Sequence, residues 1–216
     1  MKQTILLTVC LALGVTSTSI AQEGAKQIFE IENLQSKISA HKTVAVLPFD
    51  VKVTYRKQPK NFNFEANLEK EKTMSTSVQS SMYTYLLRRA SDYSVTFQDV
   101  DKTNILLRKA GVYDKLNEAT KEELANILGV DAVLSGRFLT EQTKSEAGAI
   151  ATTILFGSMG SKSGTGSVVL NLNNGTDGEL LWRFSKSMDD SILTSTDLLI
   201  ERMMRKISRN FPYTKQ

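Results

Sequence analysis

The chain has 216 residues and a formal net charge of +4, with 27 Lys and Arg residues mixed among 23 Asp and Glu residues. This mild balance, without a basic stripe interleaved with aromatic residues, excludes a nucleic-acid-binding protein of the usual basic kind. One cysteine and one histidine are too few to build a zinc centre. We therefore expect no nucleic-acid partner, no metal and no cofactor.

Residues 1–21 have the pattern of a cleavable signal peptide. Lys2 supplies the positive start, residues 5–15 form a short apolar run, and residues 19–21 (SIA) match the small-x-small pattern of a cleavage site. A buried core helix is the alternative interpretation of this run. The sequence predicts export, with a chain that starts at Gln22.

The only cysteine, Cys10, lies inside the apolar run, whereas a lipoprotein signal carries its cysteine at the end of that run. We therefore do not expect a lipid anchor. A chain without cysteine from Gln22 onward forms no disulfides, and an exported protein of this kind suits a bacterial periplasm. The predicted localisation is periplasmic.

The first elements after the signal are a lead-in segment and a strand. Residues 22–41 are polar with apolar residues at helical intervals, which predicts a short helix; a mobile arm is the alternative. Residues 42–50 predict a strand that Pro48 ends, because proline cannot donate to a β-ladder. Residues 51–55 either extend this strand or begin an edge strand. The single histidine, His41, is expected to be a solvated loop side chain.

Two helices and a short strand follow. Residues 66–90 are the longest helical candidate, with an apolar stripe along one face. Residues 93–97 predict a short strand. A helix capped by Asp99 or Asp101 and closed by Gly111 comes next.

Residues 120–140 (TKEELANILGVDAVLSGRFLT) carry the clearest local signals in the chain. Thr120 and Glu123 predict a capping box, in which each side chain satisfies a free backbone donor at the helix start. Gly129 stands where a left-handed residue ends a helix. The sequence therefore predicts a helix that stops at a tight corner.

The strand after this corner, residues 131–139, is apolar enough to predict burial on both faces. Asp131 at its entry can bond nearby backbone amides, and Gly136 lies within it. A helix that feeds directly into such a strand is half of a crossover unit. The predicted fold class is therefore α/β, a central mixed sheet flanked by helices. No nucleophile is paired with a base here, and we expect no catalytic residue.

Residues 145–166 predict an insert, an apolar run between small and glycine-serine flanks. A nearly uncharged run is unusual in an exported domain, which makes it a candidate interaction segment. One interpretation is a flap that faces a partner or a membrane, and the other is a helix buried against the sheet. The apolar residues concerned are Ile150, Ile154, Leu155 and Phe156.

The carboxyl-terminal part predicts a β-hairpin and a last helix. Residues 167–172 and 180–184 are strand-like and are joined by a turn-rich link. Trp182 on the second strand suits the core better than an exposed contact surface. The last helix starts near residue 196 and is stopped by Pro212. Residues 42–213 are expected to form a single domain.

Three stretches then line up: residues 44–50 (VAVLPFD), 123–138 (ELANILGVDAVLSGRF) and 174–187 (NGTDGELLWRFSKS). Together they resemble the periplasmic α/β module of the TolB amino-terminal domain and of the curli-secretion channel protein. The lipoprotein activators of penicillin-binding proteins look similar too. The likeness is greatest to short exported proteins of Bacteroidota, which share an ending like residues 203–213 here.

This resemblance implies a non-catalytic part of an envelope assembly. A pore like the curli channel is not expected, because residues 145–166 hold one apolar run and not a pair of alternating strands. We predict a non-enzymatic periplasmic interaction module. Its expected partners are envelope proteins or further copies of itself, with peripheral membrane contact through residues 147–159. The alternative is a domain that binds a small ligand or a peptidoglycan fragment, and a carboxylate-based hydrolase ranks behind both.

Overall fold

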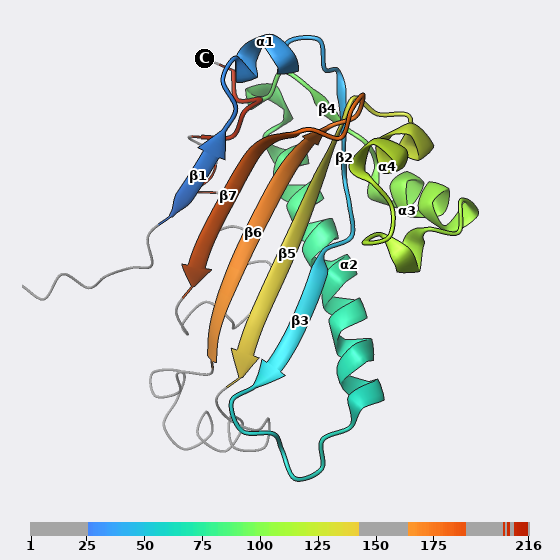
Figure 1. Cartoon of the computed structure of the whole chain (residues 1–216), viewed down its shortest axis with the longest axis vertical. Coiled ribbons are helices and arrows are strands. Elements are labelled where there is room, and N and C mark those ends of the chain that lie inside the picture. Colours follow the sequence, from blue (N-terminus) through green and yellow to red (C-terminus); the bar gives the residue numbers. More distant parts are fainter. Residues whose placement is uncertain (1–25, 143–163, 189–204, 206, 208–209, 216) are drawn as a thin grey trace, which may run out of the picture.

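A computed structural model describes residues 26–142, 164–188, 205, 207 and 210–215. The described chain forms one mixed seven-stranded sheet in the order β1-β7-β6-β5-β2-β4, and β3 also pairs with β5 (Figure 1). Helices flank this sheet, so the predicted mixed α/β fold class is confirmed. The strands are β1 (Gln27–Glu30), β2 (Thr43–Val46), β3 (Asp50–Tyr55), β4 (Thr96–Phe97), β5 (Ala132–Gln142), β6 (Gly164–Asn174) and β7 (Leu180–Met188). The α-helices are α1 (Leu34–Ile38), α2 (Phe64–Arg88), α3 (Val100–Lys109) and α4 (Lys121–Leu128), with short 3-10 turns η1 (Ala90–Asp92) and η2 (Tyr113–Lys115).

The long strand β5 organises the sheet. Along one side it pairs antiparallel with β6 over its whole length. Along the other side it pairs parallel first with β2 and then with β3. Strand β2 ends and β3 begins on either side of Pro48, which has no N–H to continue a ladder. One strand therefore carries two successive partners.

Helix α2 covers one face of the sheet (Figure 1). Its residues Val78, Met82 and Leu86 are buried in a core cluster with inward-facing residues of β2, β3, β5, β6 and β7. Residues from the carboxyl terminus join the same core, because Phe211 packs edge-on against Trp182. This face is thus mostly apolar, and alternation places the buried side chains of Thr140 and Lys186 on it as well.

Helices α3 and α4 pack on the opposite face, but only over part of it. Their buried residues Leu107, Leu124 and Leu128 form a second cluster with Ala45 of β2 and Val133 of β5. Within the described residues this cluster reaches no further along the sheet. The remainder of that face has no helix over it in the described chain.

Four sequence expectations need correction. Residues 27–30 are strand β1 and not helix, because pairing with β7 overrides their helical spacing; only residues 34–38 are helical. The strand expected at 93–97 shrinks to β4. The insert expected at 145–166 is shortened at its end, because β6 begins at Gly164. The β5 strand runs on to Gln142 and is not buried on both faces throughout. The hairpin of β6 and β7 is confirmed, and most of the expected last helix lies outside the described residues.

Candidate interaction surface

The helix-to-strand corner at residues 120–131 has the geometry that its sequence indicates. The Thr120 hydroxyl accepts from the Glu123 backbone N–H at 3.1 Å, and the Glu123 carboxylate accepts from the Thr120 N–H at 2.8 Å. Gly129 ends the helix at φ 64°, a conformation that costs glycine little. The corner is a structural device, and it presents no reactive group.

Asp131 ties the start of β5 to the start of β2. Its carboxylate accepts backbone N–H bonds from Lys42 at 2.8 Å and from Thr43 at 2.9 Å. The amides thus belong to the neighbouring strand rather than to its own corner. Burial raises the pKa of Asp131, but the two backbone bonds and the charges of His41 and Lys42 together outweigh it, and the net pKa lies below the ordinary value. The carboxylate is held in a structural role.

His41 is half-buried, which corrects the expectation of a solvated loop side chain. Its Nδ1 lies 2.7 Å from the hydroxyl of Tyr213, which comes from the other end of the chain. Burial lowers the pKa of His41, while a bond to Asn174 and the charge of Asp131 act in the opposite direction. A phenol, an amide and a carboxylate therefore surround this histidine and hold it in place, and none of the three is a nucleophile activated for catalysis.

The carboxyl ends of β2 and β4 are where an α/β sheet commonly binds its ligand. Here they carry a buried pair of amides. Gln79 Nε2 donates to the Val46 carbonyl at 2.8 Å and to Asn104 Oδ1 at 3.0 Å, and Asn104 Nδ2 donates back to Gln79 Oε1 at 3.0 Å. Both donor hydrogens of Gln79 are thus used.

A second buried amide completes this end. Gln98 Nε2 donates to the Leu128 carbonyl at 2.8 Å, and the Thr103 hydroxyl donates to Gln98 Oε1 at 2.9 Å. These polar side chains satisfy one another and the backbone, which is what burial demands. The usual ligand position is therefore filled by the protein itself.

The uncovered part of the sheet is a different kind of surface. Side chains alternate along strands, so the residues of β1, β3, β5, β6 and β7 that are out of phase with the core cluster point away from α2. We call this surface the open face. Its members are Gln27 and Phe29 of β1, Asp50, Lys52 and Thr54 of β3, Ser135, Arg137 and Leu139 of β5, Ser167, Val169 and Asn171 of β6, and Arg183, Ser185 and Ser187 of β7.

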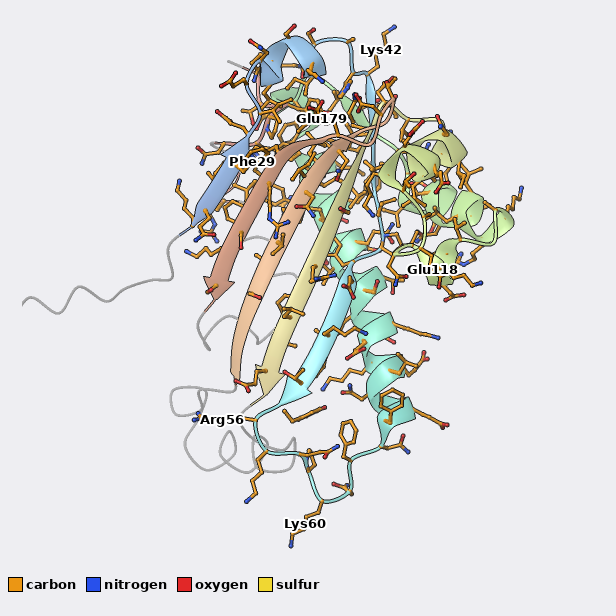
Figure 2. The ribbon with its side chains drawn as sticks, in the orientation of Figure 1. Phe29, Lys42, Arg56, Lys60, Glu118 and Glu179 are labelled. Carbon is orange, nitrogen blue, oxygen red and sulfur yellow. The ribbon has the colours of Figure 1, made fainter. Side chains whose placement is uncertain are left out.

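The register sets the neighbours on the open face. Phe29 lies opposite Arg183, Arg183 opposite Asn171, and Asn171 opposite Ser135. Arg183 donates to Asn171 Oδ1 at 3.3 Å. The row thus runs across four strands, and Figure 2 shows its outermost member, Phe29, at the margin of the sheet.

Two large apolar side chains of the open face are exposed to solvent, Phe29 at 49% and Leu139 at 42%. Arg137 and Arg183 are exposed as well, and Arg137 Nε bonds Asp50 Oδ2 at 2.7 Å. Aromatic and arginine side chains are enriched at protein interfaces and often dominate their energy. The open face thus carries two exposed apolar side chains and two arginines within an otherwise mostly polar set.

The other predicted residues are placed differently. Trp182 is fully buried beside Phe184, so it belongs to the core. Gly136 lies under the ring of Phe49, where a Cβ atom would come within 2.0 Å of Phe49 Cε1. The expected interaction segment, with Ile150, Ile154, Leu155 and Phe156, lies outside the described residues.

Sequence reasoning missed the open face because β5 reads as a continuous apolar strand. The signal that could have found it is the alternation of Ser135, Arg137 and Leu139 with Leu134 and Phe138. Residues 134 and 138 are both apolar, whereas residues 135, 137 and 139 include a serine and an arginine, which indicates that the second face of this strand is not packed in a core.

No group of three or more His, Cys, Asp or Glu side chains in the described ranges could hold a metal ion. Among the helices that the structure describes, none is both long and apolar enough to cross a membrane.

No family model and no curated protein matches the chain. Solved structures give distant likenesses. A PelC dodecamer from Paraburkholderia phytofirmans has a TM-score of 0.44 and 13% identity, covering 89% of this chain and 99% of that one. Lipoprotein GNA1162 from Neisseria meningitidis has a TM-score of 0.45 and 15% identity, covering 78% and 99%. The LpoB C-terminal domain from Salmonella enterica has a TM-score of 0.34 and 10% identity, covering 72% and 91%. Likenesses this distant decide neither fold nor function, and the resemblance to TolB and the curli channel stays a prediction.

Proposed function

We propose that this protein is a non-enzymatic interaction module of a bacterial cell envelope, exported to the periplasm, and that it acts through protein contacts. The open face is the observation that carries this proposal. It exposes Phe29 and Leu139, with Arg183 opposite Phe29 and Arg137 two residues from Leu139, on a sheet whose other face packs against α2. A pre-formed surface of this kind binds without having to order itself first.

The filled carboxyl ends of β2 and β4 support a contact function over a small-ligand function. Gln79, Asn104, Gln98 and Thr103 bond one another or the backbone there. A ligand at this position would have to break these bonds, and each buried group left unpaired costs about 1–3 kcal/mol. A binding domain for small molecules would be expected to keep its polar groups free.

The test is site-specific photo-cross-linking in living cells of the organism that makes the protein. A photoreactive amino acid replaces Leu139 on the open face, and a matched variant carries it at Ile105 on α3. The two positions are similarly exposed, at 42% and 48%, but Ile105 lies outside the open face. We expect adducts with an envelope protein from position 139 and none from position 105.

A charge substitution completes this test. Leu139→Asp removes an exposed apolar contact and should leave the melting temperature within experimental error, because the side chain is not in the core. We expect it to abolish the adduct formed from a photoreactive group placed at the neighbouring Arg137. Adducts in equal yield from positions 139 and 105, or none from the open face, would contradict the proposed function.

A further inference from the structure

The sheet has two long margins, and one of them is closed. Backbone groups in and just before β3 are bonded by side chains of α2. Val53 N–H donates to Glu71 Oε1 at 2.9 Å, and Asn67 Nδ2 donates to the Val53 carbonyl at 3.2 Å. The Ser75 hydroxyl likewise donates to the Phe49 carbonyl at 2.6 Å. Helix α2 therefore covers this part of the margin, which is one way that proteins protect a sheet edge.

The margin at β1 is not closed in this way (Figure 1). All residues of β1 are exposed, and Ile31 N–H donates to the Leu181 carbonyl at 3.1 Å. Bonding alternates along an antiparallel pair, so Gln27, Phe29 and Ile31 bond β7, while Ile28 and Glu30 turn their N–H and C=O groups outward. No strand of the described chain pairs with this side of β1.

Residues 26–30 (KQIFE) are complementary to themselves when two copies run antiparallel. With Ile28 on a two-fold axis, the two isoleucines face each other and exchange both backbone bonds. Lys26 of each copy then lies directly opposite Glu30 of the other. Opposite charges across a strand pair stabilise it, and like charges destabilise it. A register centred on Glu30 would instead place two carboxylates opposite each other.

We propose that β1 pairs antiparallel with β1 of a second copy of this chain, with Ile28 on the two-fold axis. This isologous contact closes after two copies and continues the sheet from one copy into the other. It uses the sheet edge and leaves Leu139, several strands away, untouched. The proposal therefore goes beyond the proposed function, and failure of either leaves the other standing.

Cysteine scanning tests the register in the full chain carrying Cys10→Ser, so that the introduced cysteine is the only one. In hydrogen-bonded antiparallel pairs the Cα atoms are about 5.5 Å apart, which suits a disulfide. We expect Ile28→Cys to give a disulfide-linked dimer under mild oxidation. The matched variants Phe29→Cys and Glu30→Cys, one and two positions off the axis, should remain unlinked.

A charge swap tests the same contact without a covalent bond. Lys26→Glu and Glu30→Lys each place like charges opposite each other twice in the dimer, and we expect each to raise the dimer dissociation constant about tenfold. The double variant Lys26→Glu/Glu30→Lys restores both pairs and should restore the dimer. Sedimentation velocity over a range of concentrations measures this.

The proposal stands if Ile28→Cys alone cross-links and the double variant regains the wild-type dissociation constant. It is overturned if the chain stays monomeric at all concentrations, if Phe29→Cys or Glu30→Cys links as well as Ile28→Cys, or if the double variant is no better than the singles. Melting temperatures of all variants, compared with that of the parent chain, show whether the substitutions leave the fold intact.

Discussion

Gly136→Ala tests the close contact between β5 and the ring of Phe49, which lies in the link between β2 and β3. Gly136 has an ordinary backbone conformation, so the reason for glycine is space. A Cβ atom at this position would lie 2.0 Å from Phe49 Cε1 and 2.4 Å from Cδ1. Ordinary carbon contacts lie at about 3.5–4.0 Å, so the ring would have to move by roughly 1.5–2 Å. Phe49 is only 3% exposed, so its ring is surrounded by other protein atoms.

Overpacking a core typically costs about 1–3 kcal/mol, and a clash this deep with a buried ring belongs at about 3 kcal/mol. Phe49→Ala alone removes a buried aromatic side chain and costs about 3–5 kcal/mol. In the Phe49→Ala background the clash is absent, and Ala in a strand is favoured over Gly by about 0.5–1 kcal/mol. The effect of Gly136→Ala on the free energy of unfolding should therefore change in the Phe49→Ala background, from destabilising to neutral or stabilising.

Urea unfolding followed by circular dichroism measures the four free energies of this double-mutant cycle. Gly111→Ala is the matched control, because Gly111 has φ 70° with nothing within 4 Å of an added Cβ atom. Its cost comes from backbone conformation alone and should add to that of Phe49→Ala. If the cost of Gly136→Ala is the same with and without the Phe49 ring, the ring contact is not the reason for glycine.

Three further outcomes are expected. Burial lowers the pKa of His41, so the native state favours the neutral ring. The stability that the neutral His41 ring contributes is therefore complete above the ordinary pKa of 6.5 and is lost as the pH falls through the lowered native pKa. His41→Gln should flatten the fall of the urea midpoint between neutral and mildly acidic pH. Asp131→Ala removes two charge-assisted bonds from Lys42 and Thr43 and should cost about 1.5–3 kcal/mol in chemical unfolding, with Asp131→Asn costing less. Thr120→Ala removes a capping side chain and should cost about 1 kcal/mol, measured in the same way.

Local signals predicted the parts of the fold that local bonds determine. Thr120, Glu123 and Gly129 lie within ten residues of one another, and their bonds are made inside that stretch. Their geometry follows from side-chain type and spacing alone. The hairpin of β6 and β7 has the same local origin.

Contacts between distant residues decide what the sequence did not show. Ile28 and Ile31 have helical spacing with Leu34, yet the first two belong to a stretch that bonds β7, more than a hundred residues away. His41 is half-buried because Tyr213 returns to it from the carboxyl terminus. Neither β7 nor Tyr213 can be identified as a partner from the neighbouring sequence. Local pattern therefore predicted a helix where β1 lies and a solvated side chain where His41 is half-buried.

The open face and the β1 edge combine in one geometrical consequence. A two-fold axis that relates antiparallel edge strands in a continuous sheet stands perpendicular to that sheet. Both copies therefore turn the same face to the same side, and α2 of each copy lies on the other side. The two open faces would form one surface, with Phe29 of each copy beside Gln27 of the other at the junction. A partner with two matching sites would then gain from binding both copies at once, since the second contact is intramolecular and raises the overall affinity without a new kind of contact.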